Sequence, residues 1–361
     1  MNNFSTYSSI KKFYKNKRIL ITGATGFKGS WLSFWLYKMG AKVFTTGNNP
    51  NRNKNLFYGL GLEKKTSLKI FDIRNYEKLK KEIKRIQPNI IFHLAAQPLI
   101  LKSYYDPKGT YEVNTLGTLN LLESCRNNKS ITSLVCVTSD KCYESNYSTK
   151  GFKETDRLGG KDPYSGSKAS AEIIINTYNE SFFKTSKLGL ASARAGNVIG
   201  GGDWSENRLI PDAIKSIKKN KTITLRNPNF NRPWQHVLEP LKGYLILAKK
   251  QYLNPKKYSG AWNFGTNPNS LTNVKTIVEY IIKFWGSGKM RATKKSFYVQ
   301  ANLQLNIKKA KKYLNWRPTY NIKNSVKFTT DWYKKVFKEK LLPEEVTNYQ
   351  IEKYMHDSKI D

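Results

Sequence analysis

The feature that most constrains the fold is a glycine-rich turn directly after a short apolar run. Residues 18–22 (RILIT) predict a buried strand, and Gly23, Gly26 and Gly29 follow it at intervals of three. Glycines permit a tight turn and let backbone N–H groups approach a pyrophosphate at the start of the next helix. The spacing differs from the G-x-G-x-x-G form, so the indication comes from the strand–turn–helix context as much as from the glycines. That context predicts a dinucleotide-binding unit.

Short apolar runs alternate with helical patterns through the first half of the chain. Strands are predicted at residues 41–45, 67–71, 89–94, 133–138 and 188–193, and helices at 30–39, 76–86, 107–126 and 163–178. This alternation is typical of an α/β fold built on a doubly wound parallel sheet. We expect a Rossmann-type domain over residues 1–195, in which 1–16 form an N-terminal extension. A smaller C-terminal α/β substrate domain is expected over 196–345, with a possible crossing back to the Rossmann part, and a tail over 346–361.

Composition argues against several classes of function. The 361 residues carry a formal net charge of +37, but the lysines are spread along the whole chain rather than gathered in one arm. We therefore expect no nucleic-acid partner. No apolar run is long enough for a signal peptide or a membrane span, so no membrane partner is expected. Cys125, Cys136 and Cys142 lack metal-ligand spacing, and together with three scattered histidines they predict reduced thiols, a cytoplasmic protein and no metal site.

An acid–base pair follows on the helix predicted at residues 163–178. Tyr164 and Lys168 are four residues apart and therefore share one helix face. A phenol ionises near pH 10, and a neighbouring ammonium together with a bound nicotinamide cation would lower that pKa. The phenolate could then take a proton from a sugar hydroxyl while hydride leaves the same carbon. Ser139, at the end of the strand predicted before this helix, could hydrogen-bond the same hydroxyl.

The choice between NAD and NADP stays open from the residues alone. An acid normally follows the second strand of an NAD-binding unit and holds the ribose hydroxyls. Here residues 45–49 (TTGNN) contain no acid, and the nearby Arg52 could meet a 2′-phosphate.

Longer motifs give a family resemblance. The glycine turn, Asp72-Ile73, residues 93–96 (HLAA), residues 114–118 (NTLGT), the Tyr164/Lys168 pair and residues 314–318 (LNWRP) occur in this order. Because it carries these motifs in sequence, the chain resembles the extended short-chain dehydrogenase/reductase superfamily over nearly all its length. Four further runs resemble the CDP-glucose 4,6-dehydratase family within it: residues 138–143 (TSDKCY), 194–204 (RAGNVIGGGDW), 226–228 (RNP) and 232–240 (RPWQHVLEP).

The resemblance implies NAD as cofactor and assigns residues to it. The residues implied are Gly23, Thr25, Gly26, Phe27, Lys28, Gly29, Asp72, Ile73, Leu94, Ala95, Ala96, Gln97, Asn114, Tyr164 and Lys168. The residues implied for the substrate are Asn197, Arg208, Arg226, Arg232, Gln235 and His236. Arginine forks suit a diphosphate, and the resemblance favours Asn197 and Arg232 for that group. Arg194 is left open between a substrate contact and an internal ion pair.

The resemblance also gives roles to Asp140 and Lys141. Oxidation of the sugar at C4 makes the C5 proton acidic, so a base must remove it while an acid helps the C6 hydroxyl leave as water. By analogy Asp140 is the acid and Lys141 the base, and a lysine serves as a base only when burial or positive charge lowers its pKa. The catalytic set expected is therefore Ser139, Asp140, Lys141, Tyr164 and Lys168.

The implied enzyme is a carbon–oxygen lyase that converts CDP-D-glucose into CDP-4-dehydro-6-deoxy-D-glucose. Such a product serves the synthesis of deoxysugars for cell-surface polysaccharide, such as lipopolysaccharide O-antigen. The resemblance further implies a homodimer or higher homo-oligomer, paired through the helices at residues 107–126 and 163–178. Three alternatives stay open: another nucleotide-sugar 4,6-dehydratase acting on GDP-mannose or dTDP-glucose, a nucleotide-sugar 4-epimerase that needs only Ser139, Tyr164 and Lys168, and a nucleic-acid-binding protein favoured by charge alone.

Overall fold

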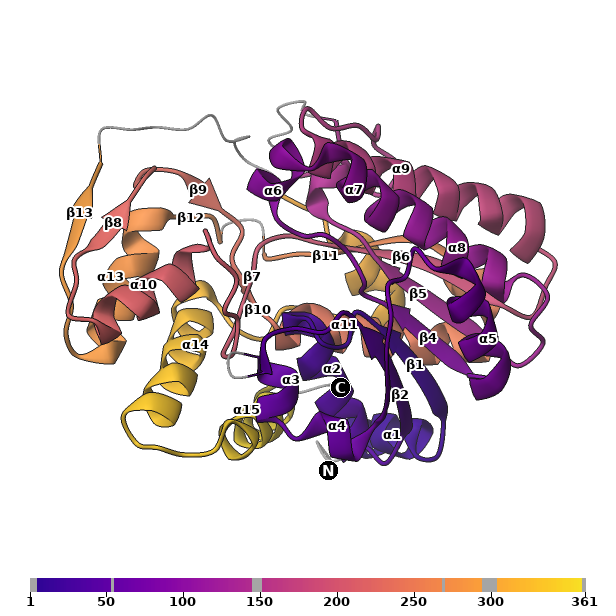
Figure 1. Cartoon of the computed structure of the whole chain (residues 1–361), viewed down its shortest axis with the longest axis horizontal. Helices are drawn as coiled ribbons and strands as arrows, with labels where there is room; N and C mark the ends of the chain where they lie inside the picture. The colour runs from indigo at the N-terminus through magenta and orange to yellow at the C-terminus, as the bar shows by residue number, and fades with distance from the viewer. Residues whose placement is uncertain (1–4, 53–54, 145–150, 268–269, 294–303, 359–361) are drawn as a thin grey trace.

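A computed structural model describes residues 5–52, 55–144, 151–267, 270–293 and 304–358. Its centre is a parallel sheet whose strands run in the order β11-β6-β5-β4-β1-β2-β3 (Figure 1). The strands are β1 Arg18–Thr22, β2 Lys42–Gly47, β3 Ser67–Ile70, β4 Ile90–His93, β5 Ser133–Val137, β6 Gly189–Ala195 and β11 Gly260–Phe264. Each neighbouring pair is parallel, so every carboxyl end of these strands meets at one edge of the sheet. That edge is where ligands bind in doubly wound folds.

Helices cover both faces of this sheet, because side chains alternate between the faces along each strand. Leu20, Ile91 and Leu134 face a core completed by α5 Tyr76–Ile86, α8 Gly117–Cys125 and α9 Pro163–Tyr178. The opposite face packs against α1 Ser5–Tyr14, α2 Phe27–Lys38, α11 Leu238–Leu253 and α15 Pro343–Asp357. The Rossmann-type doubly wound sheet expected from the sequence is confirmed.

Most predicted elements are found close to their expected bounds. The strand at 18–22 and the helices at 76–86 and 163–178 are confirmed residue for residue. The helix predicted from residue 30 begins earlier, at Phe27, because Gly26 is extended (φ −81°, ψ 170°) and caps it. The helix predicted at 107–126 is found as α7 Pro107–Tyr111, a π-helical stretch Glu112–Leu116 and then α8.

The second half of the chain builds a smaller α/β unit beside the sheet (left side of Figure 1). Its strand pairs are β7 Val198–Ile199 with β10 Gln235–His236, β8 Ile223–Leu225 with β13 Met290–Ala292, and β9 Asn231–Arg232 with β12 Thr272–Asn273. Its helices are α10 Leu209–Lys218, α13 Val274–Trp285 and α14 Ile322–Phe337. The edge strand β11 of the main sheet also comes from this half, so the chain returns to the sheet after building part of the second unit. The boundary at residue 195 stays a prediction.

Short helices and turns complete the described chain. They are α3 Leu56–Gly59, α4 Leu62–Lys65, α6 Ile100–Tyr105, α12 Pro255–Tyr258, the 3-10 turn η3 Asp140–Cys142 and the π-helical turns η4 Asn179–Phe183 and η5 Ala310–Leu314. Among the described residues, no helix has the length and apolar character needed to cross a membrane.

Candidate active site

The glycine turn after β1 is pressed against the end of β4. Gly23 has a φ of 69°, and a Cβ atom there would lie 2.5 Å from the backbone nitrogen of Ala95. A Cβ atom on Gly29 would likewise lie 2.2 Å from the carbonyl oxygen of Gly23, which is too close for two non-bonded atoms. Helix α2 therefore starts directly over the turn, and no side chain caps its first N–H groups. Uncapped N–H groups at a helix start attract anions, so the turn fits the diphosphate of a dinucleotide.

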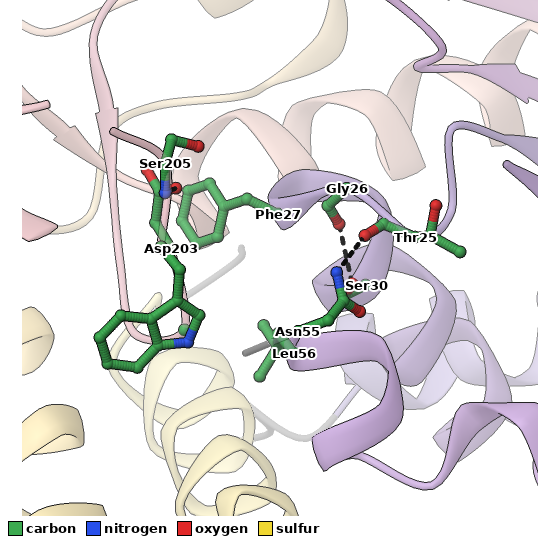
Figure 2. Close-up of a pocket in the computed structure, with 10 residues that line it drawn as sticks. Thr25, Gly26, Phe27, Ser30, Asn55, Leu56, Asp203 and Ser205 are labelled. Atoms are coloured by element: carbon green, nitrogen blue, oxygen red, sulfur yellow. Dashed lines mark hydrogen bonds between the residues drawn. The ribbon is translucent and has the colours of Figure 1, made fainter. Parts of the chain in front are cut away.

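A cavity of about 240 Å³ lies beside this turn (Figure 2). It is lined by Thr25, Gly26, Phe27, Ser30, Asn55, Leu56, Gly202, Asp203, Trp204 and Ser205. The lining thus joins the first turn of α2 to the loop that follows β7. Thr25 is fixed in place because its hydroxyl donates to the Asn48 carbonyl at 3.0 Å and its own carbonyl accepts from Asn55 Nδ2 at 2.8 Å. Arg52 lies over the ring of Tyr58, with its guanidinium carbon 4.9 Å from the ring centroid.

Two predicted cofactor residues follow β3. The carboxylate of Asp72 accepts from Arg74 at 2.8 Å, and this hydrogen bond lowers the pKa of the Asp72 carboxyl.

 Ile73 is buried and packs in the core between the sheet, α5 and α8. The cofactor roles expected for both residues stay predictions.

The segment after β4 is held by a buried amide. Leu94, Ala95 and Ala96 are partly exposed at the carboxyl edge of the sheet. The next residue, Gln97, donates its backbone N–H to Asn114 Oδ1 at 2.8 Å. Asn114 Nδ2 donates back to the Gln97 carbonyl at 3.1 Å and to the Ser167 hydroxyl of α9 at 2.9 Å. Asn114 therefore ties the predicted cofactor segment to the helix that carries Tyr164 and Lys168.

The turn after β5, residues 139–142, carries three of the predicted catalytic residues and is named here the catalytic turn. The Ser139 hydroxyl donates to Asp140 Oδ1 at 3.0 Å and accepts from the Lys141 backbone N–H at 3.2 Å. Asp140 is buried, and among the described residues its Oδ2 atom has no hydrogen-bond partner. Burial raises the pKa of the Asp140 carboxyl, against the charges of Lys141 and Arg232 that lower it. A protonated carboxyl of this kind can act as an acid near neutral pH.

Lys141 has the opposite property. Its ammonium is partly buried, and burial lowers its pKa. The charge of Asp140 opposes that shift, while the charge of Arg232 adds to it. A lowered pKa is the condition under which a lysine can accept a proton, so the direction agrees with the role expected for Lys141.

Tyr164 and Lys168 lie on the buried face of α9. The helix starts at Pro163, and the Asp162 side chain caps it by accepting from the Ser165 N–H at 2.9 Å. Burial raises the pKa of Tyr164 to about 12, although hydrogen bonding with Ser139 lowers it. Burial thus outweighs the favourable contacts within the protein, and the lowering expected when a nicotinamide cation is bound stays a prediction.

Lys168 is held against the end of β5. Its Nζ atom donates to the Val137 carbonyl at 3.5 Å. Burial lowers the pKa of Lys168 to about 8, and the charge of Glu172 raises it. The ammonium thus lies next to the strand that leads into the catalytic turn.

Lys28 lies near the catalytic residues Asp140 and Lys168, a position that the sequence did not predict. The partly buried ammonium has its pKa lowered to about 7 by burial and by the positive charges of Lys168 and Arg208, while Asp140 raises it. Arg208 also lowers the pKa of Tyr164 and forms an ion pair with Asp203 at 3.2 Å. The family resemblance implied a cofactor contact for Lys28, which lies within the glycine turn. Nothing in the sequence indicates that it faces the catalytic residues as well.

The predicted substrate residues fall into separate places. Arg232 is buried near Asp140, and its guanidinium lies over the Phe230 ring at 4.7 Å. Arg226 is exposed, donates to Asn207 Oδ1 at 3.0 Å and lines a second cavity of about 350 Å³ between α10 and β8. Asn197 is partly exposed, and its backbone carbonyl accepts from the Gln235 N–H at 3.0 Å.

Gln235 and His236 do not reach an open surface. Gln235 Nε2 donates to the Phe264 carbonyl at 3.0 Å. The His236 ring is fully buried among Trp31, Tyr320 and Phe328, and burial lowers its pKa to about 3. The substrate contacts expected for these two side chains are corrected here, because both side chains lie in the core in this conformation.

Two further expectations concern ions. Arg194 is part of an internal ion pair, with its guanidinium 2.7 Å from the Glu172 carboxylate, so the alternative of a direct substrate contact is not supported. In the described part of the chain, no group of three or more His, Cys, Asp or Glu residues could hold a metal ion.

Comparisons with known proteins agree with this geometry. A family model described as GDP-mannose 4,6 dehydratase matches residues 20–329. The chain is 40% identical over 331 residues to the CDP-glucose 4,6-dehydratase of Salmonella typhimurium, covering 90% of this chain and 92% of that protein. Among solved structures, dTDP-glucose 4,6-dehydratase from Bacillus anthracis in complex with NAD is 25% identical with a TM-score of 0.74, covering 89% of this chain and 97% of that one. Epimerase Mth375 from Methanothermobacter thermautotrophicus shares the fold at 21% identity, with a TM-score of 0.78 over 94% of this chain and 98% of that one.

Proposed function

The chain belongs to the GDP-mannose 4,6 dehydratase family, and from that premise we propose that it removes water from CDP-D-glucose to give CDP-4-dehydro-6-deoxy-D-glucose. The observation that carries the proposal is the pairing of Asp140 and Lys141 beside Ser139. Burial raises the pKa of one group and lowers that of the other. An acid and a base with these properties suit elimination of water, and a 4-epimerase has no use for them.

The residues at the glycine turn fit NAD, because Gly23 and Gly29 let the turn pack closely against Ala95 and the start of α2, and no side chain caps the first N–H groups of that helix. NAD supplies a hydride acceptor for C4 of the sugar and a hydride donor for C6 later in the same turnover. Family relatives support this cofactor, since the Bacillus anthracis dTDP-glucose 4,6-dehydratase is an NAD complex.

The first chemical task of the protein is to remove the proton of the C4 hydroxyl. We assign this to Tyr164, with Ser139 as the hydrogen-bonding partner of the same hydroxyl. The phenol is held protonated by burial, so positive charge must arrive before it can act as a base. The nicotinamide cation of the bound cofactor would provide that charge, with Lys168 already in place one helical turn along α9.

Elimination follows at C5 and C6. Lys141 takes the C5 proton, and its pKa is already lowered by burial. Asp140 gives its proton to the C6 hydroxyl, which leaves as water. The Oδ2 atom, which has no hydrogen-bond partner within the described ranges, is the position we assign to that proton. The two groups lie next to each other in the catalytic turn, so one short segment performs both halves of the step.

The nucleoside diphosphate is assigned to the smaller unit. Arg208 and Arg232 act electrostatically on Tyr164 and Asp140 respectively, so both guanidinium groups lie near the catalytic residues. We place the diphosphate between them, with Asn197 nearby. The second cavity, lined by Arg226, Leu209 and Leu225, is the proposed place for the nucleoside. This cavity lies between α10 and β8, and Arg208 occupies the N-cap position of α10.

We further propose a cytoplasmic homodimer. Cys125, Cys136 and Cys142 are all free, in agreement with a reducing compartment. Three large apolar side chains are exposed here: Leu116 in the π-helical stretch between α7 and α8, Ile173 in α9, and Phe182 in η4 directly after α9. An exposed apolar layer of this kind suits pairing with a second copy.

The deciding experiment is incubation with a panel of nucleotide sugars, followed by mass spectrometry. CDP-D-glucose should lose one water without net consumption of added NAD. Loss of water only from GDP-mannose or dTDP-glucose would reassign the substrate, and a product of unchanged mass with an inverted C4 would reassign the reaction to epimerisation. Absence of any product from the whole panel would remove the proposal.

A further inference from the structure

A buried ion pair lies directly behind the catalytic turn. The side chains of Glu172 and Arg194 are 2% and 4% exposed, and Arg194 donates to Glu172 Oε2 at 2.7 Å. A buried ion pair is by itself weak evidence for stability, because removing two charges from water costs about as much as their attraction returns. The other contacts of these two side chains give the pair a more specific role.

Glu172 holds the residue that enters the catalytic turn. The Thr138 hydroxyl donates to Glu172 Oε1, and the Ser192 hydroxyl donates to Oε2 at 2.7 Å. Thr138 directly precedes Ser139. Hydrogen bonds to a carboxylate are stronger than those between neutral groups, so Glu172 fixes where β5 ends and the turn begins.

Arg194 holds the residue that leaves the same turn. Its NH1 nitrogen donates to the Tyr143 hydroxyl at 2.7 Å and to the Glu154 carbonyl at 3.0 Å. Tyr143 directly follows Cys142, the last residue of η3, and its hydroxyl donates to Asn263 Oδ1 at 2.8 Å. One ion pair therefore reaches both ends of the segment that carries Ser139, Asp140 and Lys141.

Glu172 also acts on Lys168, which lies one helical turn earlier on the same face of α9. Its negative charge favours the protonated lysine, against the burial that disfavours it. The titratable groups that share this electrostatic environment with Lys168 are Glu172, Cys136, Cys142, His93 and Lys28. Of these, Glu172 is the nearest in sequence and carries a full negative charge, whereas burial keeps both thiols protonated.

We propose that Glu172 and Arg194 form a clamp that positions the catalytic turn at both ends and places the Glu172 carboxylate one helical turn from Lys168. Both are positioning residues, since they contact Thr138, Tyr143 and each other rather than the reacting atoms. The part of the inference that concerns Lys168 rests on the proposed function, whereas the hold on the turn does not.

Cys142 provides a test of the turn that needs no activity. It is buried within the turn, while Cys125 and Cys136 are buried elsewhere in the described core. Thr138→Val and Tyr143→Phe each remove one arm of the clamp, and Glu172→Gln removes its charge. Each variant should react with a thiol reagent about tenfold faster at Cys142 than the natural chain, the effect expected for losing one hydrogen bond to a charged group. The other two thiols should react at unchanged rates, as read by peptide mass spectrometry.

Glu239→Gln is the matched control. Glu239 is a buried carboxylate that accepts from the Thr319 and Tyr320 N–H groups and from the Tyr354 hydroxyl, and none of its hydrogen bonds to the described residues reaches the turn. Its loss should not accelerate Cys142 selectively. Unchanged protection of Cys142 in both Thr138→Val and Tyr143→Phe would overturn the clamp. An equal rise at all three thiols would also overturn it, since this reports global unfolding.

A pH profile tests the hold on Lys168. Without the Glu172 charge, the ammonium of Lys168 loses its proton at lower pH, so the alkaline limb of kcat should move down by about one pH unit in Glu172→Gln. The limb should stay in place in Glu239→Gln. A limb that does not move in folded Glu172→Gln would refute this part. If that variant does not fold, Thr138→Val and Tyr143→Phe still decide the hold on the turn, through a lowered kcat with KM nearly unchanged. If the natural chain converts no nucleotide sugar, the proposed function fails, and the thiol rates still decide the clamp.

Discussion

The Oδ2 atom of Asp140 lies 3.0 Å from the position that a Cβ atom would take at Gly196. Gly196 follows β6, whereas Asp140 follows β5, so the two meet only because these strands are neighbours in the sheet. The missing side chain at residue 196 leaves room for the carboxyl that is expected to protonate the leaving hydroxyl.

Gly196→Ala should therefore slow dehydration while leaving the fold intact. The added methyl must displace the Asp140 carboxyl by a few tenths of an ångström, and misplacement of a catalytic group costs rate steeply. We expect kcat to fall by about tenfold, with the thermal midpoint nearly unchanged. Gly59→Ala is the control, because a Cβ there meets only ordinary contacts with Pro343 at 3.5 Å. Equal activity of both variants would show that the space beside Asp140 does not matter.

Lys141→Met should separate oxidation from elimination. The change keeps the length and apolar stem of the side chain but removes the amine that is proposed to take the C5 proton. Loss of a positioned base costs about 10²- to 10⁴-fold. Reduced cofactor should then accumulate on the enzyme, visible as near-ultraviolet absorbance after CDP-D-glucose is added. Dehydration at the natural rate in this variant would exclude Lys141 from the mechanism.

The sequence predicted what is encoded locally. The strand at residues 18–22, the glycine turn and the Asp162-Pro163 start of α9 depend on neighbours in the chain, and all three are found as predicted. Contacts between distant segments were not legible. The clamp joins residues 138, 143, 172 and 194. A sequence gives no sign that the Glu172 carboxylate on α9 meets the Arg194 guanidinium on β6, 22 residues later.

The errors have the same origin. His236 lies in a run that resembles a substrate-binding motif, and polar residues in such runs suggest contact with ligand. Only the packing of Trp31, Tyr320 and Phe328 around the ring reveals that it is enclosed. The raised pKa of Tyr164 was likewise not legible from the sequence, since it comes from burial in the folded chain.

Binding of the dinucleotide should weaken as pH rises through about 7. The pKa of Lys28 is lowered to about 7, so its ammonium is present below that pH and is lost above it. A bound phosphate would favour the charged form, which means that affinity is greatest at low pH and declines as pH rises past 7. Calorimetric titration with ADP-ribose between pH 6 and 9 measures this. Lys28→Arg should abolish the decline in affinity with pH, because a guanidinium stays charged over this range. Lys28→Met should bind ADP-ribose weakly at every pH. A decline that persists unchanged in Lys28→Arg would assign the titration to another group.

The free energy of unfolding should fall as pH drops below about 6.5. His93 and His236 are both buried, and burial lowers the pKa of each to about 3. Neither takes up a proton in the folded chain at pH 5 to 6, whereas both do so once unfolded, where the pKa is about 6.5. The contribution of the two neutral histidines to the free energy of unfolding is therefore fully present above pH 6.5. It is lost as pH falls, by about 1.4 kcal/mol per pH unit for each histidine. Urea unfolding between pH 7 and 5 measures the slope of the unfolding free energy against pH.

His236→Leu replaces one ring with an apolar side chain and should reduce this slope by about half. His93→Gln should do the same while keeping hydrogen bonds to Thr22 and Thr118, which the natural ring contacts at 2.7 and 3.1 Å. A slope that neither variant changes would place the proton uptake on other residues.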